Sequence, residues 1–502
     1  MAHTLTGDAV WDIKLVCIPG PAKERFCAST DGRIFRGAVC RGARHGENMK
    51  SPSLLKNRRT NLTEGSIPRQ MLLFAFPLFL GQLLQQFYNM ADAWVVGNFA
   101  TNEAFAAVSS AGNVIFLIIG FFNGISVGGG VIISRYFGAR DRENTRRAVH
   151  TNVVMGLCAS LLATFTGLAL VRRVVVWMNV PADVMPDALT YYGVYFGGVS
   201  TVIMYNIGMS VMRALGDSLH PLGYLLVSSL LNVALDLLFV AGLKMGVAGA
   251  AWATVISQGV SAALCFLHMA RAGDDSRLRW KDMRLYPGIM KQVLLQGIPT
   301  GVQGAVISVG NLVLQSHINS FGAYAMSGHG AYSKIEGFAF LPVNSMSMSL
   351  PTFVSQNLGA GEYRRARRGA VFGIVFGMVF AEAVGLAFYF GAEPLLRFFA
   401  PDMRSVEYGM AYARVTTLFY CLLSFSHCAA GVLRGCGKSV VPMLTMLFFW
   451  CGVRILFAAF ALSRWREFTA IAWAYPITWS LSTLVFLVFL LCTDWTRGFE
   501  KT

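Results

Sequence analysis

Two similar segments occur in the chain: residues 136–147 read YFGARDRENTRR, and residues 357–368 read NLGAGEYRRARR. In each copy a long apolar run ends in Gly-Ala, and a short polar segment that closes on Arg-Arg follows it. The Gly-Ala pairs are 221 residues apart, and so are the Arg-Arg pairs. The two stretches therefore mark equivalent positions in two halves of the chain.

The same offset of 221 residues recurs well outside these stretches. Pro77 and Pro299 differ from it by one residue. The pairs that keep it are Asn123 and Asn344, Arg213 and Arg434, Gly216 and Gly437, Ser218 and Ser439, Pro221 and Pro442, and Trp252 and Trp473. A constant offset over this length indicates an internal duplication.

The composition places both halves in a membrane. Of the 502 residues, 55% are hydrophobic and only 14% are charged, which is not the balance of a soluble globular protein. Because a helix needs about 20 apolar residues to cross a bilayer and no alternating strand pattern occurs, we expect twelve transmembrane helices. These spans are 70–98, 104–134, 148–171, 188–213, 221–243, 246–270, 290–318, 323–356, 369–392, 406–433, 440–461 and 469–493.

The duplication predicts how the spans are arranged. The offset covers six crossings, an even number, so both copies enter the membrane in the same sense. We therefore expect an all-α integral membrane protein whose two six-helix bundles are related by a pseudo-two-fold axis along the membrane normal. The predicted segments are a basic tail at 1–60, an N-terminal lobe at 61–271, a cytoplasmic linker at 272–290, a C-terminal lobe at 291–493 and a tail at 494–502.

The distribution of the Lys and Arg residues, which give the chain a net charge of +16, predicts its orientation in the membrane. Most Lys and Arg residues outside the spans fall in loops on the side of the N-terminus, as in 135–147 and 364–368, so the positive-inside rule places both termini in the cytoplasm. Charges between apolar runs indicate contact with anionic lipid rather than with nucleic acid.

The N-terminal segment of residues 1–60 is predicted to be disordered. Met49 is an alternative translation start that would leave residues 1–48 untranslated.

Polar residues inside two spans predict a cation site. Gln82, Gln85, Asn89 and Asp92 form one stripe along the first span, and Asn232 lies one turn before Asp236 in the fifth. Two carboxylates kept from water, with amide neighbours, form a plausible site for H⁺ or Na⁺, because desolvation disfavours their charged forms. The alternative is a hydrogen-bonded network that only joins helices.

Other ionisable residues inside or near the spans have open roles at this stage. Lys334 and Glu336 are two residues apart and so do not share a helix face. The remaining members of this group are Glu382, Arg414, His427 and Arg454.

Two further classes of function are excluded by sequence patterns. Residues 434–439 end like a phosphate-binding loop, but Val432 stands where that loop needs glycine, so we expect no ATP binding and no cofactor. We find no nucleophile or metal cluster of an integral-membrane enzyme at the cytoplasmic face. If the protein moves a solute across the membrane against its gradient, the energy would then come from an ion gradient and not from ATP.

The assembled features resemble the multidrug and toxic compound extrusion (MATE) family, and its bacterial DinF-like branch in particular. The resemblance covers about residues 61–493 and is carried by five short segments. They are 63–68 (TEGSIP), Tyr88-Asn89 with Asp92, 95–97 (VVG), 246–251 (GVAGAA) with Ala253-Thr254, and 341–344 (LPVN).

This resemblance implies a twelve-helix antiporter that exports organic, often cationic and amphipathic, compounds in exchange for H⁺ or Na⁺ by alternating access. It implies a coupling site at Asp92, Asn232, Asp236 and Thr254, with Na⁺ bound at the two acids if Na⁺ is used. It also implies a neighbouring polar network of Gln85, Tyr88, Asn89 and Asn206, and a hinge at Pro77. Some branches of the family carry acidic residues in the seventh helix, in the C-terminal lobe. The corresponding region of this chain, between Val306 and Leu314, contains no Asp or Glu.

These inferences combine into one expectation and one alternative. We expect a monomeric exporter of small molecules, with no catalytic residues, in the bacterial cytoplasmic membrane. The alternative is a flippase for lipid-linked saccharides, whose cleft would need more cationic side chains than Arg414 and Arg454 supply.

Overall fold

The computed structural model describes residues 60–497, except 179, 274–276, 401 and 466, and two short strands nearer the N-terminus; some side chains between 102 and 117 are not described. Contacts divide the chain into two units, 1–57 and 58–502. In the first unit, β1 (Val16–Cys17) pairs antiparallel with β2 (Cys27–Ala28). The prediction of a disordered tail over residues 1–60 otherwise lies outside the described residues.

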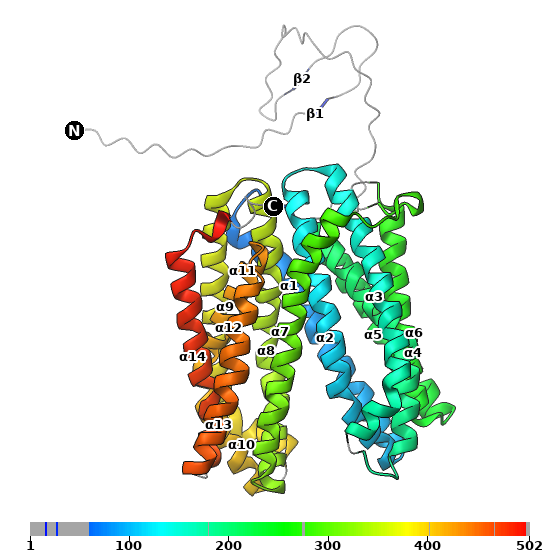
Figure 1. Ribbon diagram of the computed structural model, residues 1–502, viewed down its shortest axis with the longest axis vertical. Coiled ribbons are helices and arrows are strands. Elements are labelled where there is room, and N and C mark those ends of the chain that lie inside the picture. Colours follow the sequence, from blue (N-terminus) through cyan, green and yellow to red (C-terminus); the bar gives the residue numbers. More distant parts are fainter. Residues whose placement is uncertain are drawn as a thin grey trace, which may run out of the picture. The chain divides into compact units, whose positions relative to one another are not determined.

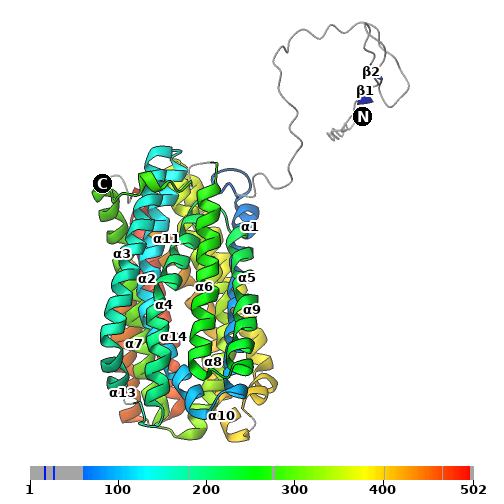
Figure 2. The ribbon, with the colours of Figure 1, turned by 90° about the vertical axis from the view of Figure 1, so that its right-hand side faces the viewer.

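The helices of the second unit run along one common direction (Figures 1 and 2). In the first half they are α1 (Ile67–Phe99), α2 (Asn102–Gly138), α3 (Arg142–Trp177), α4 (Met185–Ala214), α5 (Leu219–Asp236) and α6 (Gly246–Arg271). A π-helical segment over Leu237–Gly242 extends α5, and a 3₁₀ turn over Trp280–Asp282 lies in the linker.

The second half repeats this order with shorter pieces in two of its spans. Its helices are α7 (Pro287–Asn319), α8 (Ala323–Gly359), α9 (Tyr363–Phe399), α10 (Met403–Thr416), α11 (Tyr420–Gly435), α12 (Val440–Met446), α13 (Arg454–Arg464) and α14 (Phe468–Cys492). A 3₁₀ turn over Thr417–Phe419 joins α10 to α11, and a π-helical segment over Leu447–Val453 joins α12 to α13. Another 3₁₀ turn covers Trp495–Arg497.

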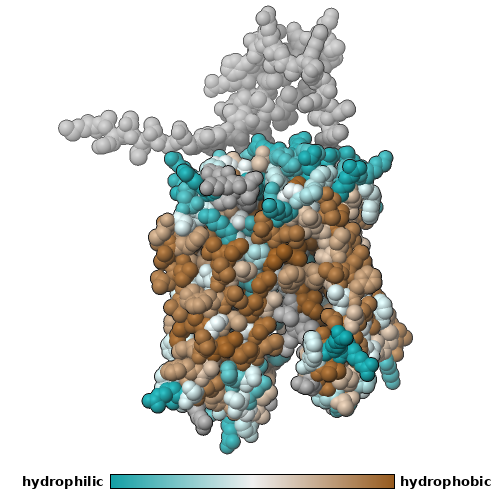
Figure 3. All heavy atoms as spheres, viewed as in Figure 1, coloured by the Kyte–Doolittle hydropathy of each residue, from teal (hydrophilic) through white to brown (hydrophobic). Residues whose placement is uncertain are grey.

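The predicted spans are confirmed. Within the described residues, eleven helical segments are long and apolar enough to cross a membrane. The twelfth, α8, is as long as α2 but carries more polar residues. On the face drawn in Figure 3, a broad apolar band lies between two polar ends, which is the pattern that a bilayer requires.

Two π-helical segments lie directly beside the buried charged residues of the fifth and eleventh spans, Asp236 and Arg454. The first begins directly after Asp236, and the second ends directly before Arg454. A π segment widens one turn and shifts the side chains beyond it, and such segments are frequent at functional sites. In both halves, therefore, the irregular part of the helix adjoins a charged residue.

The two six-helix bundles meet chiefly through α2 with α7 and α8, and through α1 with α8. Gly138 at the end of α2 packs against the backbone of Gln356, and Gly359 at the end of α8 packs against the backbone of Arg135. Because 135 and 138 are the repeat partners of 356 and 359, each contact is the other's symmetry mate. The pseudo-two-fold axis thus passes between α2 and α8 at this end of the bundle, the Gly138 end.

The repeated arginines hold the segment that follows the last helix of each half. Arg146 lies 3.8 Å from Asp282 in the linker, and Arg367 lies 2.7 Å from Asp494 after α14. A hydrogen bond from the Thr496 hydroxyl, together with Arg367 and Arg497, holds the pKa of the Asp494 carboxyl below its usual range. Both ion pairs are partly exposed, so they order the chain locally rather than stabilise the fold.

Candidate functional site

The two acids singled out in the sequence come together in the N-terminal lobe. Asp92 lies in the C-terminal half of α1, and Asp236 is the last residue of α5, which packs beside α1. Their carboxyl groups are close enough for each to act on the charge of the other. The side chain of Asp236 is 0% exposed and Asn232, one turn earlier, is 1% exposed, whereas Asp92 is half-buried.

Around these acids, several buried polar atoms have no hydrogen-bond partner. Among the described residues, they include Oδ1 of Asp92, both carboxylate oxygens of Asp236 and both amide atoms of Asn232. Buried polar groups are normally satisfied, and an unpaired one costs about 1–3 kcal/mol, more if charged. A proton between the carboxylates, or a small cation among their oxygens, would satisfy the group.

Further side chains of α1, α4 and α6 surround the acids. The hydroxyl of Tyr88, one turn before Asp92, is within hydrogen-bonding reach of Gln85 and Gln258 and close to both acids. Tyr191 of α4 is buried within electrostatic range of the two carboxyl groups. Sequence reasoning missed Gln258 and Tyr191, although Gln258 follows Thr254 by one turn on α6 and so shares its face.

The other predicted members lie less centrally. Thr254 is half-buried on α6, on the face that carries Gln258. Asn89 is exposed on α1. The side-chain amide of Asn206 donates to the carbonyl of Val202 in its own helix, at 2.9 Å, so that donor is used locally.

Pro77 lies inside a continuous α1, toward the N-terminal end of the helix from Asp92. It lines a cavity of about 810 Å³ with Leu72 and Phe76 of the same helix, and with Met346 of α8 and Phe380 of α9. The missing amide hydrogen of a proline removes one helix hydrogen bond, which makes this turn of α1 the one that bends most easily. The hinge role of Pro77 stays a prediction.

The C-terminal lobe holds a second polar network, at Glu336 of α8. The hydroxyl of Tyr332 lies 3.2 Å from Oε1 of Glu336, 2.6 Å from Oγ1 of Thr416 and 2.9 Å from the hydroxyl of Tyr420. These contacts join α8 to α10 and α11. The tyrosines carried no signal in the sequence, because aromatic residues in a span are usually packing residues.

Arg454 carries the positive charge of this network and is only 2% exposed. Its Nε and one terminal nitrogen donate to Oγ1 of Thr478, at 3.2 and 2.9 Å. The guanidinium carbon lies 5.1 Å from the ring centre of Trp450 and 4.4 Å from that of Tyr475. Arg454 and Glu336 are near enough to interact electrostatically, so the buried cation is compensated by rings and by a carboxylate.

The structure gives the remaining ionisable residues local surroundings. Lys334 is exposed beside the Phe399 ring, so it does not pair with Glu336, as its spacing predicted. Glu382 accepts a hydrogen bond from the backbone amide of Cys421 at 2.9 Å, at the start of α11. The ring of His427 packs between Phe340 and Trp450, and Arg414 is exposed.

Two equivalent six-helix lobes, with a buried acidic pair in one of them, define a polytopic transporter. The family model described as MatE matches residues 77–238 and again 299–460, once in each half of the duplication. The chain belongs to the MatE family. It is therefore a multi-pass membrane transporter of a multidrug efflux family and not an enzyme.

Individual relatives agree with this family. The chain is 26% identical over 396 residues to the probable multidrug resistance protein YpnP of Bacillus subtilis, covering 78% of this chain and 87% of the relative. A MOP superfamily transporter from Pyrococcus furiosus has the same fold, with a TM-score of 0.82 at 20% identity over 89% of this chain and 99% of that one. An outward-facing multidrug resistance MATE family transporter gives a TM-score of 0.81, again at 20% identity and with the same coverage.

Proposed function

We propose that this protein is a secondary active antiporter that exports organic, often cationic and amphipathic, compounds in exchange for H⁺ or Na⁺. The observation that carries the proposal is the pair of Asp92 and Asp236, whose buried oxygens have no hydrogen-bond donor among the described side chains. The site needs a small cation to be satisfied. If it binds this cation more tightly in one lobe arrangement than in the other, binding and release of the cation shift the balance between the two arrangements. The printed names of the relatives support drugs as cargo.

The contacts between the lobes support alternating access. At the Gly138 end, the Ser355 hydroxyl donates to the Val131 carbonyl at 2.6 Å, and the Gln356 amide donates to the Ala214 carbonyl at 2.8 Å. On the face drawn in Figure 3, the surface is hollowed between the lobes toward the opposite end. If the Gly138 end faces the cytoplasm, as the basic loops indicate, this arrangement opens outward.

The flippase alternative gains no support from the buried cation. Arg454 is enclosed by Trp450 and Tyr475 and donates to Thr478, so its charge is used inside the lobe. We place the protein, as a monomer, in the bacterial cytoplasmic membrane with both termini inside.

Uptake of a fluorescent organic cation into proteoliposomes tests the proposal. A pH gradient and a Na⁺ gradient are imposed in separate experiments, which also identifies the coupling ion. We expect Asp92→Asn and Asp236→Asn to reduce gradient-driven uptake at least about tenfold, because neither amide can exchange a cation. Glu393→Gln, which removes an exposed carboxylate paired with Arg397, is the matched control and should transport normally. Unimpaired uptake by Asp92→Asn would refute the coupling role.

A further inference from the structure

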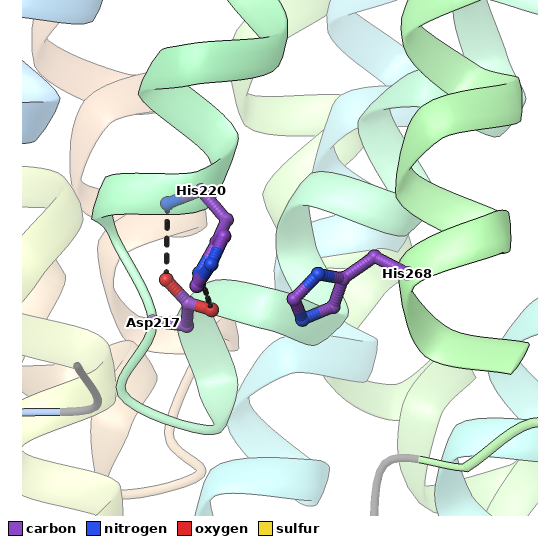
Figure 4. A group of neighbouring side chains, drawn as sticks. All are labelled: Asp217, His220 and His268. Atoms are coloured by element: carbon purple, nitrogen blue, oxygen red, sulfur yellow. Dashed lines mark hydrogen bonds and ion pairs between the residues drawn. The ribbon is translucent and has the colours of Figure 1, made fainter. Parts of the chain in front are cut away.

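A cluster of three metal-ligating side chains lies away from the acidic pair, where the turn between α4 and α5 meets the end of α6. Asp217, His220 and His268 each offer one ligand atom, and these atoms all lie within 4.8 Å of one another. Figure 4 shows Asp217 joined to His220 by two hydrogen bonds, with the His268 ring beside this pair. It is the one such group of His, Cys, Asp or Glu side chains in the part of the chain that the structure describes. Sequence reasoning, which found no metal cluster, missed this group because His268 is far from the other two residues along the chain.

The local sequence positions two of the three ligands. Gly216 adopts a φ of +82°, which turns the chain between α4 and α5. Asp217 follows with its side chain 3% exposed, and its Oδ1 accepts a hydrogen bond from the backbone amide of His220 at 3.1 Å. The Nδ1 of His220 lies 2.7 Å from Oδ2 of Asp217. The carboxylate is thus fixed at both oxygens.

The third ligand comes from α6, which packs along α5. The His268 and His220 rings have centroids 4.5 Å apart. The Tyr224 hydroxyl, one turn beyond His220, lies 2.9 Å from Nδ1 of His268. Metal-binding histidines are commonly oriented by such an oxygen partner on the ring. The His220 side chain is 37% exposed, so ions can reach the cluster from solvent.

The C-terminal lobe contains the same corner of the fold without these ligands. At the repeat offset, Lys438 stands for Asp217, Val441 for His220 and Phe489 for His268. The Nζ of Lys438 lies 5.4 Å from the ring centre of Phe489, so positions 438 and 489 meet just as 217 and 268 do. The fold therefore builds this corner with a cation and apolar groups, and packing does not require two histidines and an aspartate.

We propose that Asp217, His220 and His268 bind a divalent transition-metal ion of the Zn²⁺ class, with water completing the coordination. Two imidazoles and one carboxylate are a donor set that Zn²⁺, Co²⁺ and Ni²⁺ accept, whereas Mg²⁺ and Ca²⁺ prefer oxygen ligands alone. Metal–ligand bonds of about 2.0–2.2 Å place tetrahedral ligands roughly 3.3 Å apart, so side-chain movements suffice to close the site. The ion then takes the position of the proton between His220 and Asp217.

Bound metal would clamp the start of α5 to the end of α6. Asp236 lies at the other end of α5, so the clamp and the acidic pair are separate sites on one helix. The inference does not rest on the proposed transport function, because metal binding can be measured on the protein without transport.

The experiment uses full-length protein without a polyhistidine tag, stripped of metal in detergent and titrated with Zn²⁺ by isothermal calorimetry. We expect one Zn²⁺ per chain with an accompanying rise in melting temperature, and no such response to Mg²⁺. His220→Val and His268→Phe install the residues of the C-terminal lobe and should each weaken Zn²⁺ binding by roughly 100-fold. Asp217→Asn keeps an oxygen for the turn and should weaken binding less.

The matched control is His317→Phe, which removes a histidine of α7 outside the cluster and should leave binding unchanged. Melting temperatures in the presence of chelator verify that each variant is folded, and His220→Gln replaces His220→Val if the latter does not fold. The proposal is overturned if wild-type protein binds no Zn²⁺, or if the His220 and His268 variants bind it as tightly as the wild type does.

Discussion

Asp92 and Asp236 differ in their access to solvent, and this difference suggests the order in which a cation reaches them. Asp236 is fully enclosed, while Asp92 keeps part of its side chain accessible. Tyr88 lies next to both, one turn from Asp92. A cation entering the lobe would therefore meet Asp92 first and then be shared with Asp236, whose two oxygens lack donors within the described part of the chain.

The unsatisfied pair makes a prediction about stability. Asp236→Asn keeps the shape of the side chain, removes the repulsion and supplies an amide donor for Asp92. In Na⁺-free buffer at alkaline pH, where both acids of the wild type are charged, the variant should melt at least as high as the wild type. At acidic pH a proton satisfies the wild-type pair, so the difference should shrink. A variant that melts more than roughly 5 °C lower at alkaline pH would contradict this account.

A second residue-level prediction concerns Arg454 and Glu336. If their charges compensate each other in the C-terminal lobe, removing one partner leaves the other buried without compensation. Arg454→Met and Glu336→Gln should therefore each lower the melting temperature, and the double variant should lose less than the two single losses combined. The coupling is expected to be about 0.5–3 kcal/mol. Strictly additive losses would mean that Thr478 and the rings alone stabilise Arg454.

At the scale of elements, the contact of α2 with α7 depends on glycines. A Cβ added at Gly124 would meet the backbone of Gly301, and one at Gly128 would meet the backbone of Gly297. Glycines four residues apart allow two membrane helices to approach at the distance of their backbones. By contrast, a Cβ added at Gly120, one turn earlier on α2, meets nothing within 4 Å.

These neighbouring glycines provide a matched pair of variants. Gly124→Ala should force α2 and α7 apart and disfavour the lobe arrangement described here, whereas Gly120→Ala should be tolerated. Spin labels at the exposed Arg140 and Arg364 report the separation of the lobes at the Gly138 end. We expect a longer distance and reduced transport for Gly124→Ala only. Equal behaviour of the two variants would argue against a close α2–α7 contact.

At the scale of the whole molecule, the duplication makes a prediction of symmetry. Gly138 and Gly359 make equivalent contacts across the pseudo-two-fold axis, each with the backbone of the other lobe. Gly138→Ala and Gly359→Ala should therefore reduce transport to a similar extent, because each added methyl group pushes apart the same interface between the lobes. Gly391→Ala in α9, where an added Cβ meets nothing within 4 Å, is the control.

A distance measurement extends this test. If the lobes pivot as rigid units, an alanine that separates them at the Gly138 end should bring them closer at the other end of the bundle. The distance between spin labels at Arg173 and Arg397, which lie near the C-terminal ends of α3 and α9, should then become shorter. An unchanged distance in both glycine variants would show that the lobes do not move as rigid bodies. A change in only one of them would show that the contacts are not equivalent.

The architecture could be predicted from the order of the amino acids alone. Runs of apolar residues set the twelve spans, since a bilayer admits only helices whose length matches its thickness. The constant offset between the halves fixed their relation, because an even number of crossings leaves both copies in the same sense. The stripe of Gln85 and Asp92 on the first span, and the pair of Asn232 and Asp236 on the fifth, could also be read from helical spacing.

Contacts between side chains of different helices could be identified only from the folded arrangement. Helical spacing describes one helix at a time, so it could not bring Asp92 of α1 to Asp236 of α5 or Glu336 of α8 toward Arg454 of α13. It likewise gave no sign that His268 lies beside His220, 48 residues earlier in the chain. These partners depend on how the helices pack and rotate, and on the π-helical segments beside two of the charges, which local sequence does not specify.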